Sequence, residues 1–344
     1  MTKGTAAHYS SVGDYEIAAR KHLSQDLAEY IYFGTESETT LSRNIDQFSR
    51  LQLRRRVLTG IESVKSKFTY FDGQIKSELP FFPACINTSQ LYSNALPDIL
   101  ALSKTRDVPM FVSEFAVKPP FEFAKLPTVF KNAKLMWQIY VQRGKIDQSL
   151  RQAQNAKSLG YAGVVVTVDA EQNVKLRNTI PTKLMSQQFI PVSPREVKKL
   201  RERTTLPFIV KGVMTGEDAV LAIESGADGV VVSNHGGRVL DYAQASIEVL
   251  PEIVGAVKSK KSTRKAEIFH DGGIRRGTDI LKALALGARG CLLGRAIFWG
   301  LVTDHKNGVQ NVVRILEEEL VRAAILCGVS DLSKIKRSVV VLGN

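Results

Sequence analysis

The feature that most constrains the fold of this chain is a series of short apolar runs, rich in β-branched residues, that begins near residue 80. Their starts lie roughly 20–45 residues apart, which is the length of a strand followed by a helix. Nearly continuous apolar runs are typical of strands that are covered on both faces, as in a parallel sheet. Eight such units predict an α/β chain folded as a closed (β/α)8 TIM barrel. The runs cover residues 81–86, 110–115, 136–141, 163–169, 208–213, 229–235, 267–273 and 290–295.

The segments between the runs have the features of helices. TGEDAVLAIESGADG offers Thr215 as an N-cap, acidic residues in the first turn and a glycine stop, and RRGTDILKALALGARG repeats that form. The polar stretch after the fourth run predicts a loop over the barrel mouth. With no linker or low-complexity tract, we expect a single domain over residues 1–344. It would comprise a helical N-terminal segment (1–75), the barrel (80–300) and a C-terminal helical segment (301–344).

The net charge of +13 could indicate either nucleic acid or an anionic small ligand as the partner. The basic runs at 54–56, 198–203 and 258–265 are far apart and have no aromatic residues interleaved with them. A solvated basic surface is therefore favoured, and a nucleic-acid partner is not expected. No apolar stretch approaches the roughly 18 residues of a membrane span, so none is expected either.

Compartment signals are weak. The N-terminus lacks the charged-then-apolar layout of a secretion signal. Cys85, Cys291 and Cys327 lie far apart without the spacing of metal ligands, and we expect reduced thiols in an intracellular protein with no metal site. The chain ends in Leu-Gly-Asn rather than the peroxisomal Ser-Lys-Leu signal. Cytoplasm and peroxisome both remain open.

Polar side chains gather where the runs end, which is where barrels build their active sites. SNHGGRVLD (233–241) places a titratable base, His235, three residues before a fixed cation, Arg238. DGGIR (271–275) and Gly294-Arg295 follow the last two runs and fit the phosphate site of such barrels. Together these residues predict an anionic organic substrate beside a phosphorylated cofactor.

The stretches SNHGGRVLD, HDGGIRRGTDILKALALGARG, VVTVDA and FIVKGVMTGEDA resemble the FMN-dependent L-2-hydroxy acid oxidase/dehydrogenase family, which includes glycolate oxidase, lactate oxidase and flavocytochrome b2. The resemblance extends from DYEIAARKHL to the final helix. It implies an FMN cofactor, oxidation of an L-2-hydroxy acid to the 2-oxo acid, and a homotetramer. It leaves open whether dioxygen or another acceptor takes the electrons, and whether the chemistry is of the hydride or the carbanion type.

The resemblance also implies roles for individual residues. His235 would be the base and Asp169 its partner, Arg238 would bind the substrate carboxylate, and Lys211 would stabilise the reduced flavin near N1/O2. Substrate hydrogen bonds would come from Tyr30 and Tyr140. The isoalloxazine would contact Ser113, Gln138, Thr167 and Ser233, together with the strand end Pro83-Ala84-Cys85. The ribityl chain and phosphate would be held by Asp271, Gly273, Arg275, Gly294 and Arg295.

Two departures from the family pattern stand out. After VTVD the family has a Gly-Arg-Arg motif whose arginine is a second carboxylate ligand; here the stretch Ala170–Asn178 lacks it, and the loop is shorter. Lys175 or Arg177 are the candidates to replace it, and losing such a ligand costs about 1.5–3 kcal/mol of binding. An FMN barrel with an altered substrate, or a catalytically impaired flavin-binding protein, is therefore the alternative. His270 stands where the family has an aliphatic residue, and we expect it to be a core residue.

Overall fold

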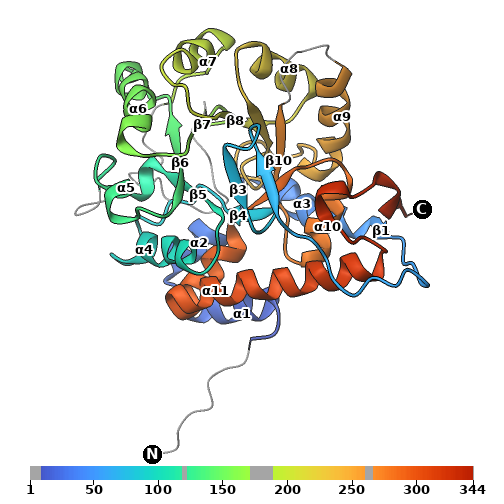
Figure 1. The fold of residues 1–344 in the computed structure, drawn as a ribbon. Helices are drawn as coiled ribbons and strands as arrows, with labels where there is room; N and C mark the ends of the chain where they lie inside the picture. Colours follow the sequence, from blue (N-terminus) through green and yellow to red (C-terminus); the bar gives the residue numbers. More distant parts are fainter. Residues whose placement is uncertain (1–8, 118–121, 171–188, 260–265, 344) are drawn as a thin grey trace, which may run out of the picture.

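The centre of the molecule is one sheet of parallel strands. The computed structural model describes residues 9–117, 122–170, 189–259 and 266–343. Its main sheet has eight strands in the order β4-β11-β10-β9-β8-β7-β6-β5, and the two end strands also contact each other. The predicted (β/α)8 barrel is thereby confirmed, in a nearly closed form (Figure 1). The strands are β4 (Phe81–Pro83), β5 (Pro109–Ser113), β6 (Lys134–Tyr140), β7 (Gly163–Thr167), β8 (Phe208–Val213), β9 (Gly229–Val232), β10 (Glu267–Asp271) and β11 (Gly290–Leu293).

The apolar runs form these strands because the sheet is covered on both faces. All residues of β5, β7, β9 and β10 are buried, and the valines of β7 have no exposed surface. Such strands can have apolar side chains at successive positions, where a half-exposed strand would alternate. The outer layer consists of α4 (Ala95–Leu100), α5 (Leu126–Val129), α6 (Ile146–Leu159), α7 (Pro194–Arg201), α8 (Gly216–Glu224), α9 (Ser246–Ser259), α10 (Gly277–Ala285) and α11 (Arg295–Leu326).

Helix α8 begins and ends where the local sequence signals predict. The Thr215 hydroxyl accepts a hydrogen bond from the Asp218 backbone N–H at 3.1 Å, so Thr215 is the N-cap that the sequence predicts. The helix ends before Gly226, whose φ of +102° is a backbone conformation that glycine adopts easily.

The N-terminal part is helical only as far as residue 49. Helices α1 (Val12–His22), α2 (Gln25–Tyr32) and α3 (Thr39–Ser49) are followed by strands, so the predicted helical segment 1–75 is wrong beyond residue 49. The strands are β1 (Leu51–Leu53), β2 (Phe68–Tyr70) and β3 (Ile75–Ser77). Strands of three residues are too short to show an alternating pattern in a sequence.

The C-terminal part also ends in a strand. Helix α11 is followed by short 3-10 turns and β12 (Val340–Leu342), which pairs antiparallel with β1, so the segment 301–344 is only partly helical. Strands β2 and β3 form a separate hairpin. Helix α1 packs along α11 and attaches the N-terminal helices to the barrel (Figure 1).

Helix α11 is interrupted at Asp304 and His305, which have non-helical backbone angles. His305 has φ 48° and ψ −136°, a conformation that side chains with a Cβ rarely adopt. The break brings Gly300 against Gly308, where a Cβ on Gly308 would lie 2.0 Å from the Gly300 carbonyl oxygen. The two halves of the helix therefore cross at a contact that only glycine permits.

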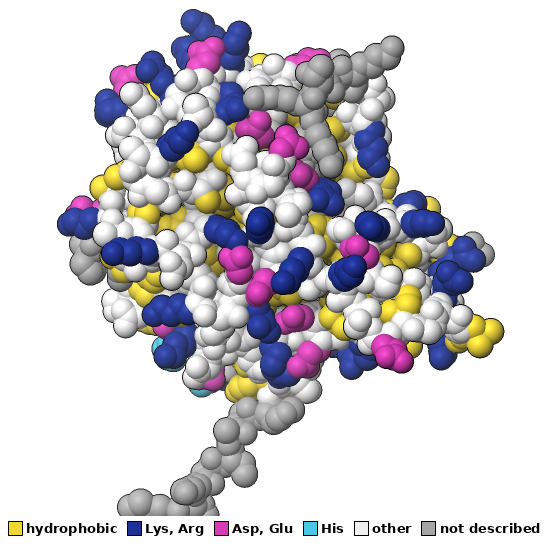
Figure 2. All heavy atoms as spheres, in the orientation of Figure 1, with side chains coloured by type: hydrophobic (Ala, Val, Ile, Leu, Met, Phe, Trp, Pro, Cys, Tyr) yellow, Lys and Arg dark blue, Asp and Glu magenta, His cyan; other side chains and the backbone are white. Residues whose placement is uncertain are grey.

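On the face shown in Figure 2, lysine and arginine side chains are spread among acidic and neutral ones. That distribution agrees with the solvated surface expected from the dispersed basic runs. In the part of the chain that the structure describes, no helix combines the length and apolar character needed to cross a membrane.

Candidate active site

A cavity of about 820 Å³, including its open mouth, lies at the carboxyl ends of the barrel strands. It is lined by residues of β4, β5, β6, β8, β10 and β11 or directly after them, by the loop after β9, and by helices α2 and α11. Thirteen of the predicted site residues line it: Tyr30, Ala84, Cys85, Ser113, Tyr140, Lys211, His235, Arg238, Asp271, Gly273, Arg275, Gly294 and Arg295.

His235 and Asp169 form a pair at this cavity. The His235 Nδ1 lies 2.9 Å from the Asp169 Oδ1, and the aspartate side chain is 9% exposed. Burial opposes ionisation of Asp169, but His235 and Lys211 outweigh it and hold its pKa below the usual value. Asp169 is therefore an ionised partner that orients the imidazole, with the other ring nitrogen, Nε2, free of this contact.

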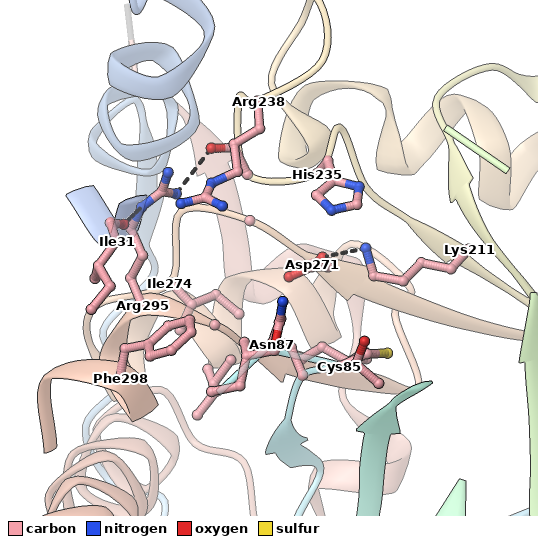
Figure 3. Close-up of a pocket in the computed structure, with 18 of the residues that line it drawn as sticks. Ile31, Cys85, Asn87, Lys211, His235, Arg238, Asp271, Ile274, Arg295 and Phe298 are labelled. Carbon is pink, nitrogen blue, oxygen red and sulfur yellow. Dashed lines mark hydrogen bonds and ion pairs between the residues drawn. The ribbon is translucent and has the colours of Figure 1, made fainter. Parts of the chain in front are cut away.

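The loop that carries His235 has an unusual backbone. His235, Gly236 and Gly237 have φ of 56°, 68° and 78°, so three successive residues lie in the left-handed region. Histidine is tolerated there at a cost, while glycine is not strained. This conformation turns the chain sharply after β9 and directs the imidazole into the cavity (Figure 3).

Helix α3 holds this loop in place. The side-chain amides of Asn44 and Asn234 exchange two hydrogen bonds of 2.9 Å. The Asp241 carboxylate accepts hydrogen bonds from the backbone N–H groups of Ser37 and Thr40, both at 2.9 Å. Since Glu38, the N-cap residue of α3, makes no side-chain capping bond, Asp241 supplies the cap from a distant part of the sequence.

Lys211 lies deep in the site, where its ammonium contacts two groups. Its Nζ donates to the Ser233 hydroxyl at 2.9 Å and lies 3.0 Å from the Asp271 Oδ2. Ser233 in turn donates to the same carboxylate oxygen at 2.8 Å. Burial opposes the charge of Lys211, but Asp271 and Asp169 keep its pKa above the usual value. The site thus contains a permanently charged, nearly buried cation.

Three arginines, Arg238, Arg275 and Arg295, line the cavity, and none has a carboxylate within ion-pair distance among the described residues. Burial lowers the pKa of Arg295 well below its usual value, and repulsion by Arg238 and Arg275 adds to this. Figure 3 shows Arg238 and Arg295 on one side of the cavity, with His235 and Lys211 on the other. Because a guanidinium stays protonated in proteins, this arrangement calls for an anionic ligand.

Arg295 has a second role that the sequence did not indicate. Its guanidinium donates to the backbone carbonyls of Ile31 (3.0 Å), Gly236 (2.9 Å) and Phe33 (3.3 Å). It therefore links the chain around α2 to the loop that carries His235. Its predicted contact with a phosphate stays a prediction.

Two predicted tyrosines lie at different sides of the cavity. Tyr140 is buried and stacks on Phe115 with ring centroids 4.9 Å apart, and its ring lies 6.5 Å from that of His235. Tyr30 lies beneath Arg238, whose guanidinium carbon is 4.8 Å from the ring centroid. Cys85 lies at the cavity floor, where burial raises the pKa of its thiol to about 12, so it is a neutral thiol.

Other predicted residues lie behind the cavity wall rather than in it. Gln138 and Thr167 are buried and joined by a hydrogen bond of 2.6 Å from Nε2 to the hydroxyl. The Gln138 Oε1 has no hydrogen-bond partner within the described part of the chain. Pro83, Ser233 and Asp169 support the lining residues from behind, and Lys175 lies outside the described residues.

His270 faces away from the cavity. It is fully buried, its Nε2 lies 3.1 Å from the Ser246 hydroxyl, and it packs edge-on against Phe48. Burial lowers its pKa to about 4, so it is a neutral core residue as expected. Its Nδ1, however, has no partner among the described residues.

Sequence reasoning missed some lining residues, although nearly all of them are neighbours of predicted ones and could have been found by extending each motif. They are Ile31, Ile86, Asn87, Gly236, Gly272, Ile274, Leu292, Leu293 and Phe298. It also missed Glu114, whose carboxylate accepts a 2.7 Å hydrogen bond from the Tyr140 backbone N–H. Burial raises the pKa of Glu114 to about 7. No sequence pattern signals that contact.

Comparison with known proteins gives a consistent result. The family described as FMN-dependent dehydrogenase matches residues 19–191 and 176–342 of this chain. The L-lactate oxidase of Nostoc sp. is 33% identical over 94% of this chain and 96% of its own length. The human 2-hydroxyacid oxidase 1 is 32% identical over 96% of this chain and 95% of its own length.

Solved structures agree with these sequence matches. A crystal structure of mandelate oxidase with benzoyl-formic acid superposes with a TM-score of 0.86 at 30% identity. The alignment covers 98% of this chain and 99% of that one. The similarity therefore extends over the whole barrel and over the N-terminal helices that close the site.

Proposed function

This chain belongs to the FMN-dependent dehydrogenase family, and on that premise we propose that it oxidises an L-2-hydroxy acid to the 2-oxo acid with His235 as the base. Family membership supports FMN and oxidation of a CH–OH group. The choice of substrate and the roles of single residues are the proposal. The His235–Asp169 pair beside three arginines is the observation that carries it.

The residues that line the cavity fit FMN in charge. Arg275 and Arg295 can hold the phosphate, because neither has a carboxylate within ion-pair distance among the described residues. Lys211, whose Nζ lies 3.0 Å from the Asp271 Oδ2 in the deep part of the cavity, can stabilise negative charge on the reduced isoalloxazine. FMN, when bound, accepts the two electrons of the oxidation.

In the proposed reaction the protein's own side chains accept the substrate proton and stabilise the charges that form. His235 donates its Nδ1–H to Asp169, which leaves Nε2 as the acceptor for a substrate proton. The imidazolium that results is stabilised by the ionised carboxylate 2.9 Å away. Lys211 places a second positive charge in the buried part of the site, where charge interactions are strong.

The substrate carboxylate requires a cation close to His235. Arg238, three residues later in the same loop, lines the same cavity and has no carboxylate partner among the described residues. Its planar fork can bind both oxygens of a carboxylate. Tyr140, whose ring lies near that of His235, is the second substrate-binding group that we propose.

The proposal is tested by recording the flavin spectrum of the purified protein and mixing it anaerobically with L-2-hydroxy acids from glycolate to mandelate. We expect one of them to bleach the flavin band, and His235→Gln to abolish the bleaching while FMN stays bound. His22→Gln, at the exposed end of α1, is the matched control and should react like the native protein. Bound FMN that no hydroxy acid reduces would instead indicate an altered substrate or an impaired site. A protein that binds no flavin would refute the proposal.

A further inference from the structure

Trp299 is a buried tryptophan whose indole N–H lacks a hydrogen-bond partner among the described residues. It is 1% exposed and lies in the first turns of α11. A buried donor that is left unpaired destabilises the folded state. Trp137, the other tryptophan of the chain, donates its Nε1 to Gln152 at 3.3 Å. What distinguishes Trp299 is the contact made by its ring.

The ring of Trp299 belongs to a row in which two stacked aromatic rings lie between two arginines. The guanidinium carbon of Arg275 lies 4.6 Å from the centroid of the Trp299 ring. Tyr32 stacks on the same indole at 5.7 Å with an interplanar angle of 24°, and Arg20 lies 4.0 Å from the Tyr32 centroid. The Tyr32 hydroxyl is fixed by donating to the Glu16 carbonyl at 2.7 Å. The row therefore runs from the surface of α1 to the cavity.

The orientation of the Arg275 guanidinium relies on its contact with the Trp299 ring, because few other groups hold it. Its guanidinium donates to the carbonyl of its own neighbour, Ile274, at 2.9 Å, and no carboxylate lies within ion-pair distance among the described residues. Burial lowers its pKa. The electron-rich face of an indole is a strong partner for such a cation, and it leaves the edge of the guanidinium fork free for a ligand.

Arg295 is held differently. Its fork is fixed by backbone carbonyls of Ile31, Phe33 and Gly236, so its orientation does not rely on an aromatic ring. Removing the indole should thus affect Arg275 selectively. The two arginines of the same cavity offer a comparison within one molecule.

We propose that Trp299 is a positioning residue that holds the Arg275 fork toward the cavity and thereby selects the phosphorylated flavin over its unphosphorylated form. The inference rests on the proposed function, because it takes the cavity to be the FMN site. Trp299 itself touches neither substrate nor the reacting atoms; its effect passes through Arg275.

The test measures binding rather than turnover. The apoprotein is titrated with FMN and with riboflavin, which lacks the phosphate, by quenching of flavin fluorescence. A desolvated cation–π contact is worth about 2 kcal/mol, so Trp299→Leu should weaken FMN binding by about 10- to 30-fold. Riboflavin binding should change by less than about twofold. Trp299→Phe keeps an aromatic face and should restore most of the FMN affinity.

Trp137→Leu is the matched control, since Trp137 is equally buried but lies on β6, packed against Phe123 and Tyr161. General loosening of the barrel would weaken FMN and riboflavin alike. If Trp299→Leu lowers both affinities equally, or neither, the inference is wrong. Should that variant fail to fold, Trp299→Met and Trp299→Phe decide the question, because methionine fills space without a ring. A native apoprotein that binds neither flavin would refute the proposed function itself.

Discussion

Gly212 lies against Asp169, at a backbone position where any side chain would displace the carboxylate that binds His235. It lies in β8, directly after Lys211, with φ +107°. A Cβ built on it would lie 2.5 Å from the Asp169 Cγ and 2.9 Å from its Oδ2. Since such atoms are normally about 3.5–4.0 Å apart, Gly212→Ala must displace the carboxylate by about 1 Å.

The displacement acts on the hydrogen bond that orients the base. The Asp169 Oδ1 lies 2.9 Å from the His235 Nδ1, so a shift of that size breaks or severely bends the bond. A charge-assisted hydrogen bond is worth about 1.5–3 kcal/mol, and left-handed strain adds about 1–2 kcal/mol. We expect Gly212→Ala to lower the free energy of unfolding by about 2.5–5 kcal/mol. We also expect it to slow anaerobic flavin reduction by about 10²–10³-fold, within the range of general-base catalysis.

The assay needs a control that carries the strain without the clash. Gly73 has φ +90°, and a Cβ added there would meet no atom within 4 Å, so Gly73→Ala supplies that control. Flavin reduction is followed by stopped-flow absorbance with the best hydroxy acid, and unfolding by urea. Gly73→Ala should lose about 1 kcal/mol of stability and keep its rate.

A double-mutant cycle separates the clash from the strain. In an Asp169→Ala background the carboxylate is gone, so adding Gly212→Ala should cost only the strain that Gly73→Ala measures. Two results would refute the reasoning. One is a Gly212→Ala protein that reduces its flavin at the native rate. The other is an undiminished stability cost once Asp169 has been removed.

Two further predictions concern stability. His305→Gly relieves a backbone conformation that costs about 1–3 kcal/mol, and it loses a contact with Asp98 that is worth less than about 1 kcal/mol. The melting temperature of His305→Gly should therefore rise by about 1–3 °C, whereas His305→Ala should lower it. The pKa of His270 is lowered to about 4, so the folded state disfavours its charged form and stability is lost as pH falls from about 6.5 to 4. At pH 5, His270→Leu should therefore have a free energy of unfolding about 1–2 kcal/mol higher than the native protein, measured in urea. The same difference at pH 8 would show that the charge of His270 is not the cause.

The barrel could be predicted because each strand is a local apolar run covered on both faces. Strand β7 (GVVVT) has that form, and Thr215 marks the start of a helix by a single capping bond. Strands β1 and β12 could not be predicted in this way, since each has three residues and their pairing joins opposite ends of the chain. The helical interpretation of residues 50–75 failed at β1 for the same reason, because a partner distant in sequence decides the structure of that short segment. Strand β2 pairs with its neighbour β3, but three residues are too few to show a strand pattern.

At the site, the residue types and the His235–Asp169 pair were predictable, but most other contacts of these residues were not. His235 follows a recognisable strand and Lys211 lies in the last half of another, so their place at the barrel mouth follows from the fold. Nothing in the sequence indicates that the Arg295 fork is used by backbone carbonyls, or that Trp299 lies against Arg275. Those contacts depend on how α2 and α11 pack over the barrel, which is a property of the tertiary structure.

The motif SNHGGRVLD illustrates why chemistry and architecture are hard to separate in a sequence. His235 and Arg238 face the cavity, whereas Asn234 and Asp241 bind α3 by hydrogen bonds. The carbonyl of Gly236 accepts from Arg295, which also holds the backbone near α2. The left-handed backbone of His235 is strained and persists only when its surroundings fix the loop from several sides. The polar groups of the motif that take no part in the reaction therefore attach the loop to helices α2 and α3. These contacts hold the base, His235, in place.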